Sequence, residues 1–240
     1  MAEVMISVDG LTVEYGGKRV LNNVSLEIER GEVMVLLGGS GCGKTTMLRH
    51  IIGLERPTSG TVRVRGVDIN RCSKEELMAI RRTMGVAFQE CALFNSMSVE
   101  ENVELPLHEL TNLADPVIEI MTYMKLAAVG LGDTGKLMPQ ELSGGMKKRA
   151  AVARATALDP EILVFDEPSA GLDPISARRL DDLILELRAS LGVRENAARV
   201  VVHVGRDEAG ADDGEEEHYS TPPALEEVHG GAISGCGAAS

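Results

Sequence analysis

Long apolar runs are missing from this sequence of 240 residues. No stretch of about twenty consecutive apolar residues occurs, and a membrane-spanning helix requires that length. The N-terminal residues Met1–Val4 begin neither the basic nor the apolar segment of a secretory signal. We therefore expect no membrane span and no signal peptide. The hydrophobic content of 44% is still enough for a sizeable core, in one large domain or two small ones.

Paired cysteines and an excess of positive charge are missing as well. The four cysteines (Cys42, Cys72, Cys91 and Cys236) form no Cys-x-x-Cys pair. We expect free thiols in a reducing compartment rather than disulfides or a zinc site. The net charge of −13 argues against a general nucleic-acid-binding protein. Residues 206–240 hold nine acidic residues and one arginine, and so account for −8 of that charge.

A glycine-rich stretch joins a buried strand to a helix near the N-terminus. Apolar residues 33–37 predict the strand, and residues 47–52 predict the helix. The stretch between them reads Gly38-Gly39-Ser40-Gly41-Cys42-Gly43-Lys44-Thr45-Thr46. This is the pattern of a P-loop, in which backbone N–H groups and a helix N-terminus bind phosphate. Lys44 would contact the β- and γ-phosphates of a nucleotide, and Thr45 would bind Mg²⁺. The alternative is a glycine-rich turn that binds nothing.

Polar side chains follow two further predicted strands. Gln89 comes after residues 84–88, and the pair Asp166-Glu167 comes after residues 161–165. Ligands bind beyond the carboxyl ends of the strands in an open parallel sheet. There Gln89 would reach a metal ion and a water, Asp166 would hold Mg²⁺ through water, and Glu167 would act as a general base. A strand-end glutamine is also common in loops, and an acidic pair also occurs in ordinary turns.

Two strands of an antiparallel sheet are predicted before the glycine-rich stretch, at residues 4–14 and 20–28. In the second, apolar and polar residues alternate, as in a half-exposed strand. Tyr15 lies in the loop that follows the first strand. Its ring would stack on a nucleotide base, or it is an ordinary turn tyrosine, and its position alone favours neither.

A helical insertion is predicted at about residues 90–158, where the buried-strand pattern disappears. Capping boxes predict helix starts at Ser73, before the insertion, and at Ser98, inside it. Residues 115–128 show helical spacing of apolar side chains, which we interpret as core. These positions are Val117, Ile120, Met121, Met124 and Ala128. The expected fold is α/β: a P-loop core with a small antiparallel sheet and this insertion.

A second anion-binding element is predicted at Ser143-Gly144-Gly145, where small residues begin an alanine-rich helix that ends near residue 158. The alternative is a flexible hinge before that helix. The basic triplet that follows, Lys147-Lys148-Arg149, is interpreted as a solvated face. Asp173 is predicted to cap a later helix, with Pro174 at its first position.

Taken in order, these stretches resemble the motifs of ABC transporter ATPases, from residue 5 to about residue 193. The matching parts are the P-loop, Gln89, residues 142–146, Asp166-Glu167 and residues 169–173. The resemblance implies ATP with Mg²⁺. It implies that Gln89 and Glu167 are catalytic, and that Thr45, Gln89 and Asp166 surround the metal.

The same resemblance implies further contacts to the nucleotide. Tyr15 becomes the aromatic residue that stacks on the base. Ser143, Gly144 and Gly145 become the signature that contacts the γ-phosphate of ATP held by the other subunit. The implied partners are a second copy in a head-to-tail dimer and a membrane permease.

A narrower resemblance is to the ATPase subunits of the maintenance-of-lipid-asymmetry (Mla) transporters. It rests on Met146 in the Leu-Ser-Gly-Gly-Met stretch and on residues 88–89, 92–99, 102–107 and 137–142. It implies transport of phospholipid or a related lipid in a Gram-negative envelope. It also implies a substrate-binding partner with an MCE domain, and a peripheral position on the cytoplasmic face of the inner membrane.

The resemblance fails after residue 193. ABC ATPases continue with a strand, a histidine that contacts the γ-phosphate, a helix and two closing strands. Here His203 follows a β-branched run, and it is either that switch histidine or an accidental match. We expect residues 1–205 to form the ATPase domain. Residues 206–240 lack periodicity, and we expect a disordered tail, either diverged or produced by a frameshift near residue 194.

Three functions are compatible with these patterns. The leading one is ATP hydrolysis that drives lipid transport in a membrane-bound ABC complex. The alternative is a subunit that binds nucleotide without hydrolysis, because the C-terminal part of the domain is missing. A soluble ABC ATPase of DNA repair or translation is disfavoured by the single ATPase domain and by the absence of a basic patch.

Overall fold

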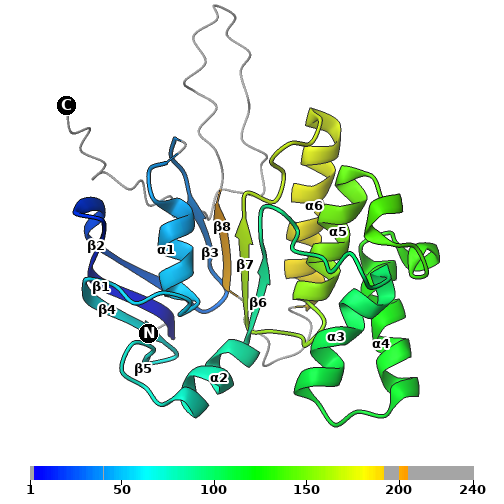
Figure 1. Ribbon diagram of the computed structural model, residues 1–240, viewed down its shortest axis with the longest axis horizontal. Helices are drawn as coiled ribbons and strands as arrows, with labels where there is room; N and C mark the ends of the chain where they lie inside the picture. Colours follow the sequence, from blue (N-terminus) through cyan, green and yellow to red (C-terminus); the bar gives the residue numbers. More distant parts are fainter. Residues whose placement is uncertain (1–2, 40, 192–199, 205–240) are drawn as a thin grey trace, which may run out of the picture. The chain divides into compact units, whose positions relative to one another are not determined.

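The computed structural model describes residues 3–39, 41–191 and 200–204. The chain divides into two compact units, and Figure 1 shows their helices and strands. The first unit is Met1–Cys72 with Val202–Ser240, and the second is Ser73–Val201. The tail predicted at residues 206–240 lies outside the described residues.

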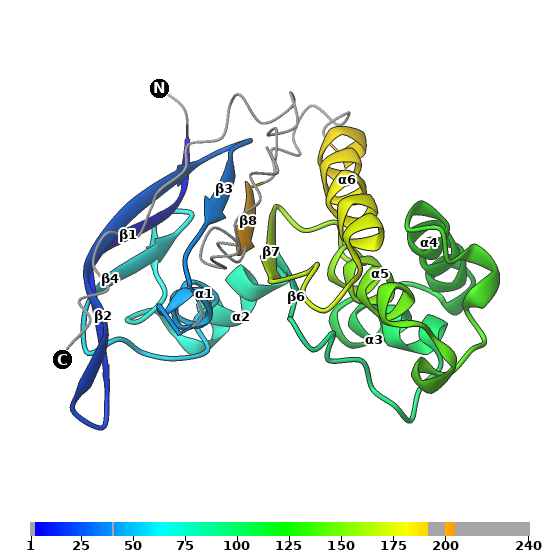
Figure 2. The same cartoon turned by 90° about the horizontal axis from the view of Figure 1, so that it is seen from above.

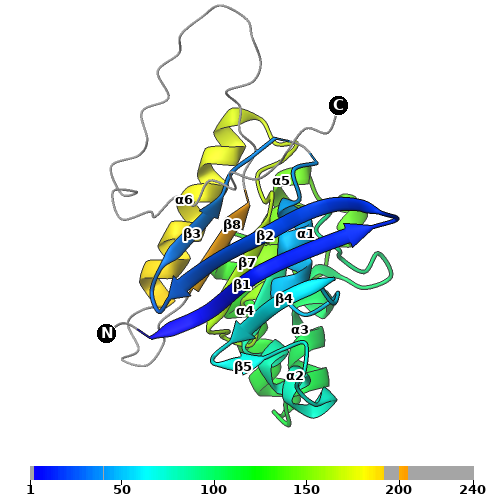
Figure 3. The ribbon, with the colours of Figure 1, turned by 90° about the vertical axis from the view of Figure 1, so that its left-hand side faces the viewer.

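The first unit contains an antiparallel sheet with the strand order β2-β1-β4-β5. Its strands are β1 (Val4–Tyr15), β2 (Lys18–Glu29), β4 (Ser59–Val64) and β5 (Val67–Asp68). Figure 3 shows β1, β2 and β4 side by side. The two strands predicted at residues 4–14 and 20–28 are confirmed, because β1 and β2 pair along their length, from Val4 opposite Glu29 to Tyr15 opposite Lys18.

The same unit contains β3 (Val33–Leu36) and α1 (Lys44–Ile51), joined by the glycine-rich stretch. Helix α1 contacts β2 and β4, and Figure 2 shows it against the sheet. Met47, Leu48 and Ile51 of α1 are buried. Each such side chain contributes about 1.5–3 kcal/mol when it leaves water. This packing fixes the N-terminus of α1, and with it the glycine-rich stretch, against the antiparallel sheet of the same unit.

The second unit contains two parallel strands with helices between and around them. In chain order its elements are α2 (Lys74–Arg82), β6 (Met84–Ala87), α3 (Val99–Leu110), α4 (Asp115–Ala128), η1 (Gly132–Thr134), η2 (Pro139–Glu141), α5 (Gly144–Ala155), β7 (Ile162–Asp166) and α6 (Pro174–Leu191). Strand β8 (Val200–Val204) crosses the boundary between the units. The predicted helical insertion is confirmed, because only helices and turns lie between β6 and β7.

Strands β6 and β7 run parallel, and Ala87 pairs with Phe165. Their carboxyl ends therefore lie at the same edge. Helix α5 contacts α3, α4, α6 and β6. Gly85 permits this close packing, because a Cβ atom there would lie 2.0 Å from the carbonyl oxygen of Ala155. Any larger residue at position 85 would force β6 and the end of α5 apart.

Local sequence signals set the helix starts as predicted. Ser73 and Ser98 each accept a hydrogen bond from the backbone three residues on, and the capping boxes with Glu76 and Glu101 are both complete. Asp173 accepts a hydrogen bond from the Ser176 N–H at 3.0 Å, at the start of α6. Such caps satisfy N–H groups that have no partner inside the helix, and each is worth about 1 kcal/mol.

Helix α4 is confirmed, but the prediction of its buried face is wrong. The buried side chains are Ile118, Thr122 and Leu126. Val117, Ile120 and Met124, which we expected in the core, are 43%, 61% and 62% exposed. Apolar residues surround much of this helix, so the contacts with α3 and α5 decide which of them are buried.

Across the described ranges, no helix has the length and hydropathy needed to cross a bilayer.

Candidate functional site

The glycine-rich stretch forms a tight turn into α1. Gly43 caps the helix with φ of 99°, a left-handed conformation that favours glycine. A Cβ atom there would lie 2.8 Å from Cδ2 of Leu21 and 3.3 Å from the carbonyl oxygen of Val20, both on β2. The stretch is therefore pressed against β2, and its first helical hydrogen bond runs from the Met47 N–H to the Gly43 carbonyl at 2.8 Å.

Lys44 is the buried cation of this turn. Its side chain is 4% exposed, and its ammonium donates hydrogen bonds to the carbonyl of Gly38 and, at 3.0 Å, to that of Gly39. The Sγ atom of Cys42 lies 3.8 Å from the same nitrogen. A buried ammonium requires hydrogen-bond acceptors. Here they are atoms of the turn itself, so the charge lies over the backbone that a P-loop offers to phosphate.

Tyr15 lies at the end of β1 and its ring is half exposed. Its hydroxyl donates a hydrogen bond to the carboxylate of Glu55, which also pairs with Arg49 at 3.3 Å. Burial and then this bond raise the pKa of the Tyr15 hydroxyl, whereas a hydrogen bond with the Thr46 side chain lowers it. The structure therefore brings Tyr15 beside the first turn of α1, where the sequence predicted a nucleotide.

Two of the predicted catalytic residues meet at one edge of the second unit. Gln89 follows β6, and Glu167 follows Asp166, the last residue of β7. Since the two strands are parallel and paired, these side chains leave the sheet at the same end. Asp166 is 4% exposed. Glu167 has φ of 44°, which is unfavourable for a residue other than glycine and common at functional sites.

The predicted signature lies at the N-terminus of α5. Ser143 caps this helix by accepting a hydrogen bond from the Met146 N–H at 3.3 Å. Ser143 and Gly144 are exposed, and Gly145 is half-buried. The first N–H groups of a helix lack partners inside it and carry a partial positive charge. This end of α5 can therefore accept an anion from the solvent side. The helix itself ends at Ala155, three residues earlier than predicted.

The interpretation of residues 147–149 as a solvated face is wrong. Lys148 is 9% exposed, and its ammonium donates to the carbonyl of Gln89 at 2.6 Å and to that of Glu167 at 3.4 Å. The Arg149 guanidinium also donates a hydrogen bond to the protein, to the carbonyl of Val129 at 3.1 Å. A signal for the burial of Lys148 was present, since it shares the helical spacing of the buried residues Ala151, Val152 and Ala155.

Arg154, further along α5, was also missed by the sequence reasoning. Its guanidinium donates to the carbonyls of Ala92 at 2.6 Å and Cys91 at 2.9 Å. Both of these residues have left-handed backbones, with φ of 49° and 61°. Two cations of one helix thus hold the segment that follows β6, one at Gln89 and one at residues 91–92.

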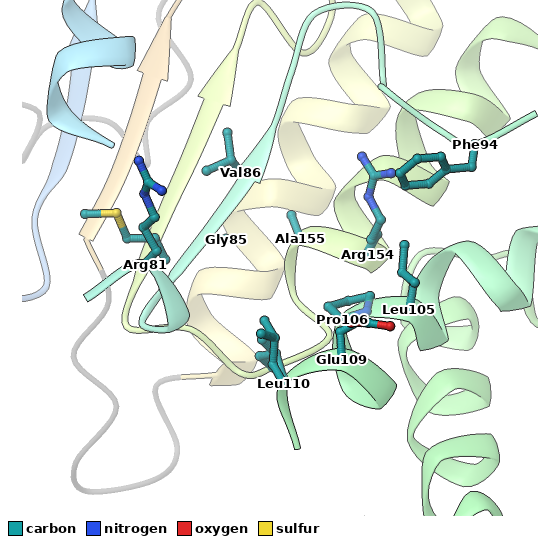
Figure 4. Close-up of a pocket in the computed structure, with 12 residues that line it drawn as sticks. Arg81, Gly85, Val86, Phe94, Leu105, Pro106, Glu109, Leu110, Arg154 and Ala155 are labelled. Carbon is teal, nitrogen blue, oxygen red and sulfur yellow. The ribbon is translucent and has the colours of Figure 1, made fainter. Parts of the chain in front are cut away.

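Arg154 also lines a groove of about 350 Å³ (Figure 4). Arg154 and Phe94 lie at one end of it and Arg81 at the other. Its remaining lining is mostly apolar and comes from β6, α3, the end of α5 and the turn that follows it: Met84, Gly85, Val86, Leu105, Pro106, Glu109, Leu110, Ala155 and Leu158. Phe94 is 51% exposed. None of the predicted nucleotide-binding residues lines this groove.

The structure places the remaining predicted residues as follows. Gly38–Thr46, apart from Ser40, and Tyr15 belong to the first unit, and Gln89, Ser143–Gly145, Asp166 and Glu167 belong to the second. Ser40 lies outside the described residues. His203 lies within β8, and its side chain lies outside what the structure describes.

The motif order and the two units define an ATP-binding cassette. Residues 21–170, more than half of the chain, match the model of the ABC transporter family. The chain belongs to that family. This confirms the resemblance on which the assignment of the motifs rests.

The chain is also similar to two named transport ATP-binding proteins. The probable ribonucleotide transport ATP-binding protein Mkl of Mycobacterium tuberculosis is 47% identical over 188 residues, which are 78% of this chain and 52% of that protein. The intermembrane phospholipid transport system ATP-binding protein MlaF of Escherichia coli K12 is 43% identical over 189 residues, 79% of this chain and 70% of that protein. This chain therefore spans about half the length of the Mkl relatives.

Solved structures confirm the predicted α/β P-loop fold. A dimeric structure of the ATP-binding cassette MJ0796 bound to ADP and Pi is 32% identical, with a TM-score of 0.74. The match covers 85% of this chain and 88% of that one. The structure of cbiO1 from Clostridium perfringens gives the same TM-score of 0.74 at 29% identity, over 85% of this chain and 79% of that one.

Proposed function

We propose that this chain is the ATP-hydrolysing subunit of an ABC transporter that moves phospholipid or a related lipid. The observation that carries the proposal is the buried ammonium of Lys44, held over the backbone of a P-loop turn at the N-terminus of α1. Family membership and the relatives named above support the same conclusion.

On the phosphate side, the chain binds ATP through the turn of residues 38–46. Backbone N–H groups of the turn and the N-terminus of α1 attract the phosphates. Lys44 exchanges its carbonyl partners for β- and γ-phosphate oxygens, which are stronger acceptors because they are charged. Tyr15, already fixed by Glu55, offers its half-exposed ring to the base.

On the hydrolytic side, Glu167 accepts a proton from the attacking water, and Gln89 orients that water. The hydrogen bond between Lys148 and the Glu167 carbonyl fixes the backbone from which the general base extends. Catalysis of phosphoryl transfer depends on positioning of the reactants and on electrostatic stabilisation of the transition state, because the reaction leaves little covalent chemistry for the protein to perform.

The donor set fits a magnesium ion. Thr45, Gln89 and Asp166 offer a hydroxyl, an amide oxygen and a carboxylate, the hard oxygen ligands that Mg²⁺ prefers together with water and phosphate. When bound, Mg²⁺ neutralises charge that develops on the phosphate oxygens. Asp166 would hold the ion through water, and Thr45 and Gln89 would supply the further oxygen ligands.

The functional form is a head-to-tail dimer. Ser143, Gly144 and Gly145 present an exposed helix N-terminus, which suits the γ-phosphate of ATP bound by the second copy. Support comes from the relative MJ0796, whose structure is dimeric and contains ADP and Pi. Residues 1–205 form the ATPase domain in this proposal, and His203 serves as the switch histidine that contacts the γ-phosphate.

The transport partners are a membrane permease and a substrate-binding protein with an MCE domain. The chain then lies peripherally on the cytoplasmic face of the inner membrane. Support for a lipid substrate comes from the MlaF relatives, whose names specify intermembrane phospholipid transport. The Mkl relatives carry the name of a probable ribonucleotide transporter instead, so both substrates enter the test.

The test uses the full chain with its permease, reconstituted in vesicles with Mg·ATP. We expect ATP-dependent transfer of a fluorescent phospholipid, and no transfer with the Glu167→Gln variant. Uptake of radiolabelled ribonucleotide without lipid transfer would assign the other substrate. A chain that binds Mg·ATP but never hydrolyses it, alone or with the permease, would contradict the proposal.

A further inference from the structure

We propose that Lys148 is a positioning residue for ATP hydrolysis, which connects the signature end of α5 to Gln89 and Glu167. The inference rests on the proposed function, because it assigns a role within that reaction. The Lys148 side chain has no contact with the nucleotide in this role. It acts through the two backbone carbonyls that it holds.

The contacts of Lys148 are specific and buried. The ammonium lies 2.6 Å from the carbonyl oxygen of Gln89 and 3.4 Å from that of Glu167, and the residue is 9% exposed. An ammonium in so dry a place requires acceptors, and a carbonyl beside a full positive charge makes a stronger hydrogen bond than one beside a neutral donor. One side chain therefore connects the ends of β6 and β7.

The backbone at these ends requires such support. Glu167 has φ of 44°, a left-handed conformation that is unfavourable for a residue with a side chain. The carbonyl that Lys148 holds belongs to this residue, so the bond restricts the peptide plane that follows the general base. A general base works only when its carboxylate lies within hydrogen-bond reach of the water, and an error of about 1 Å can cost a hundredfold in rate.

The position of Lys148 along α5 gives the connection a direction. Ser143 caps the same helix five residues earlier, which corresponds to roughly 7.5 Å along the axis. A helix transmits displacement as a rigid element, so a shift of its N-terminus on phosphate binding moves the ammonium and both carbonyls with it. The signature of one chain is thereby linked to Gln89 and Glu167 of the same chain.

The experiment compares three variants of the full chain with the wild type. Lys148→Met removes the ammonium and keeps the length of the side chain, and Lys148→Arg keeps the charge. Lys147→Met is the matched control, because it removes the same charge from a partly exposed neighbour in the helix. Each protein is measured for the Kd of Mg·ATP, for kcat and KM, and for amide hydrogen exchange at residues 88–92 and 166–170.

We expect Lys148→Met to lower kcat by about 10- to 100-fold. The Kd of Mg·ATP should change by less than about threefold, because the Lys148 side chain acts on two backbone carbonyls and not on the nucleotide. Exchange should accelerate at both segments, Lys148→Arg should recover most of kcat, and Lys147→Met should behave like the wild type. If Lys148→Met does not fold, Lys148→Gln, which keeps an N–H donor without the charge, takes its place.

Two results would overturn the inference. Unchanged exchange at both segments would show that the tether does not hold them, and faster exchange with an unchanged kcat would show that the tether is only structural. A wild-type chain that does not bind Mg·ATP would instead refute the proposed function, before any variant is compared. The two failures are thus distinguishable.

Discussion

The hydroxyl of Tyr15 donates a hydrogen bond to the carboxylate of Glu55, and this bond fixes an exposed aromatic ring beside the start of α1. The bond also lowers the pKa of Glu55, with a further contribution from Arg49. The carboxylate therefore stays ionised at neutral pH and remains a full acceptor for the hydroxyl. A ring held in this way loses little freedom when a base stacks on it.

Substitutions at Tyr15 separate the ring from the hydroxyl. We expect Tyr15→Ala to weaken ATP binding by about 5- to 150-fold, because stacking of a base on an aromatic ring is worth about 1–3 kcal/mol. Tyr15→Phe keeps the ring and should stay within about threefold of the wild type. Equilibrium titration with ATP measures both. Equal affinities for the alanine variant and the wild type would make Tyr15 an ordinary turn residue.

Lys44→Ala tests the phosphate site. Its ammonium would make charge-assisted contacts with phosphate, each worth about 1.5–3 kcal/mol, so we expect ATP affinity to fall by roughly 10- to 150-fold. Lys74→Ala, which removes an exposed lysine of α2, is the control and should leave the Kd unchanged. The assignment of the P-loop fails if the two variants bind ATP equally well.

Glu167→Gln tests the general base. Glutamine keeps the shape of the side chain and cannot accept the proton, so hydrolysis should slow by at least about 100-fold while ATP binding persists. The trapped ATP should also stabilise the dimer that hydrolysis normally ends. Size-exclusion chromatography with Mg·ATP checks the second point. A monomer with full turnover would contradict both expectations.

Asp181, on α6, predicts a dependence of stability on pH. Burial, and then the neighbouring charge of Asp182, raise its pKa from 3.8 to about 6, and its Oδ1 atom is buried without a hydrogen-bond partner in the described part of the chain. The neutral acid is therefore favoured in the folded state. Its contribution to stability is complete below pH 3.8 and is lost as the pH rises through about 6.

We therefore expect Asp181→Asn to stabilise the protein at pH 7.5, by about 1–3 kcal/mol in the free energy of unfolding. The gain should shrink as the pH falls from 7 to 4. Urea unfolding at a series of pH values measures it. Glu186→Gln, at an exposed position of the same helix, should change stability by less than about 0.5 kcal/mol. A gain that does not vary with pH would show that ionisation of Asp181 is not its cause.

Local signals in the sequence were sufficient for much of the fold. The capping boxes at Ser73 and Ser98, the cap at Asp173 and the strands β1 and β2 all form as predicted. Each cap depends on residues three positions apart, so a short window of sequence contains the whole interaction. The glycine-rich turn belongs to the same class, because its geometry depends on adjacent residues.

Contacts between residues distant in the sequence decided which side chains are buried, and here the sequence patterns gave wrong predictions. Lys148 is adjacent to another lysine and an arginine, and only the approach of the chain at Gln89 and Glu167 makes it a buried tether. Likewise, α4 offers several apolar faces, and its neighbours α3 and α5 select the one that is buried.

The sequence alone determined where the glycine-rich turn, the acidic strand end and the helix starts lie, because these are properties of short segments. Only the tertiary structure decided which charges are buried and what they hold, as for Lys148, Arg154 and Asp181. The physical reason is that desolvation and hydrogen bonding of a charged group depend on residues distant in the chain. Folding brings those residues together, and no local pattern records them.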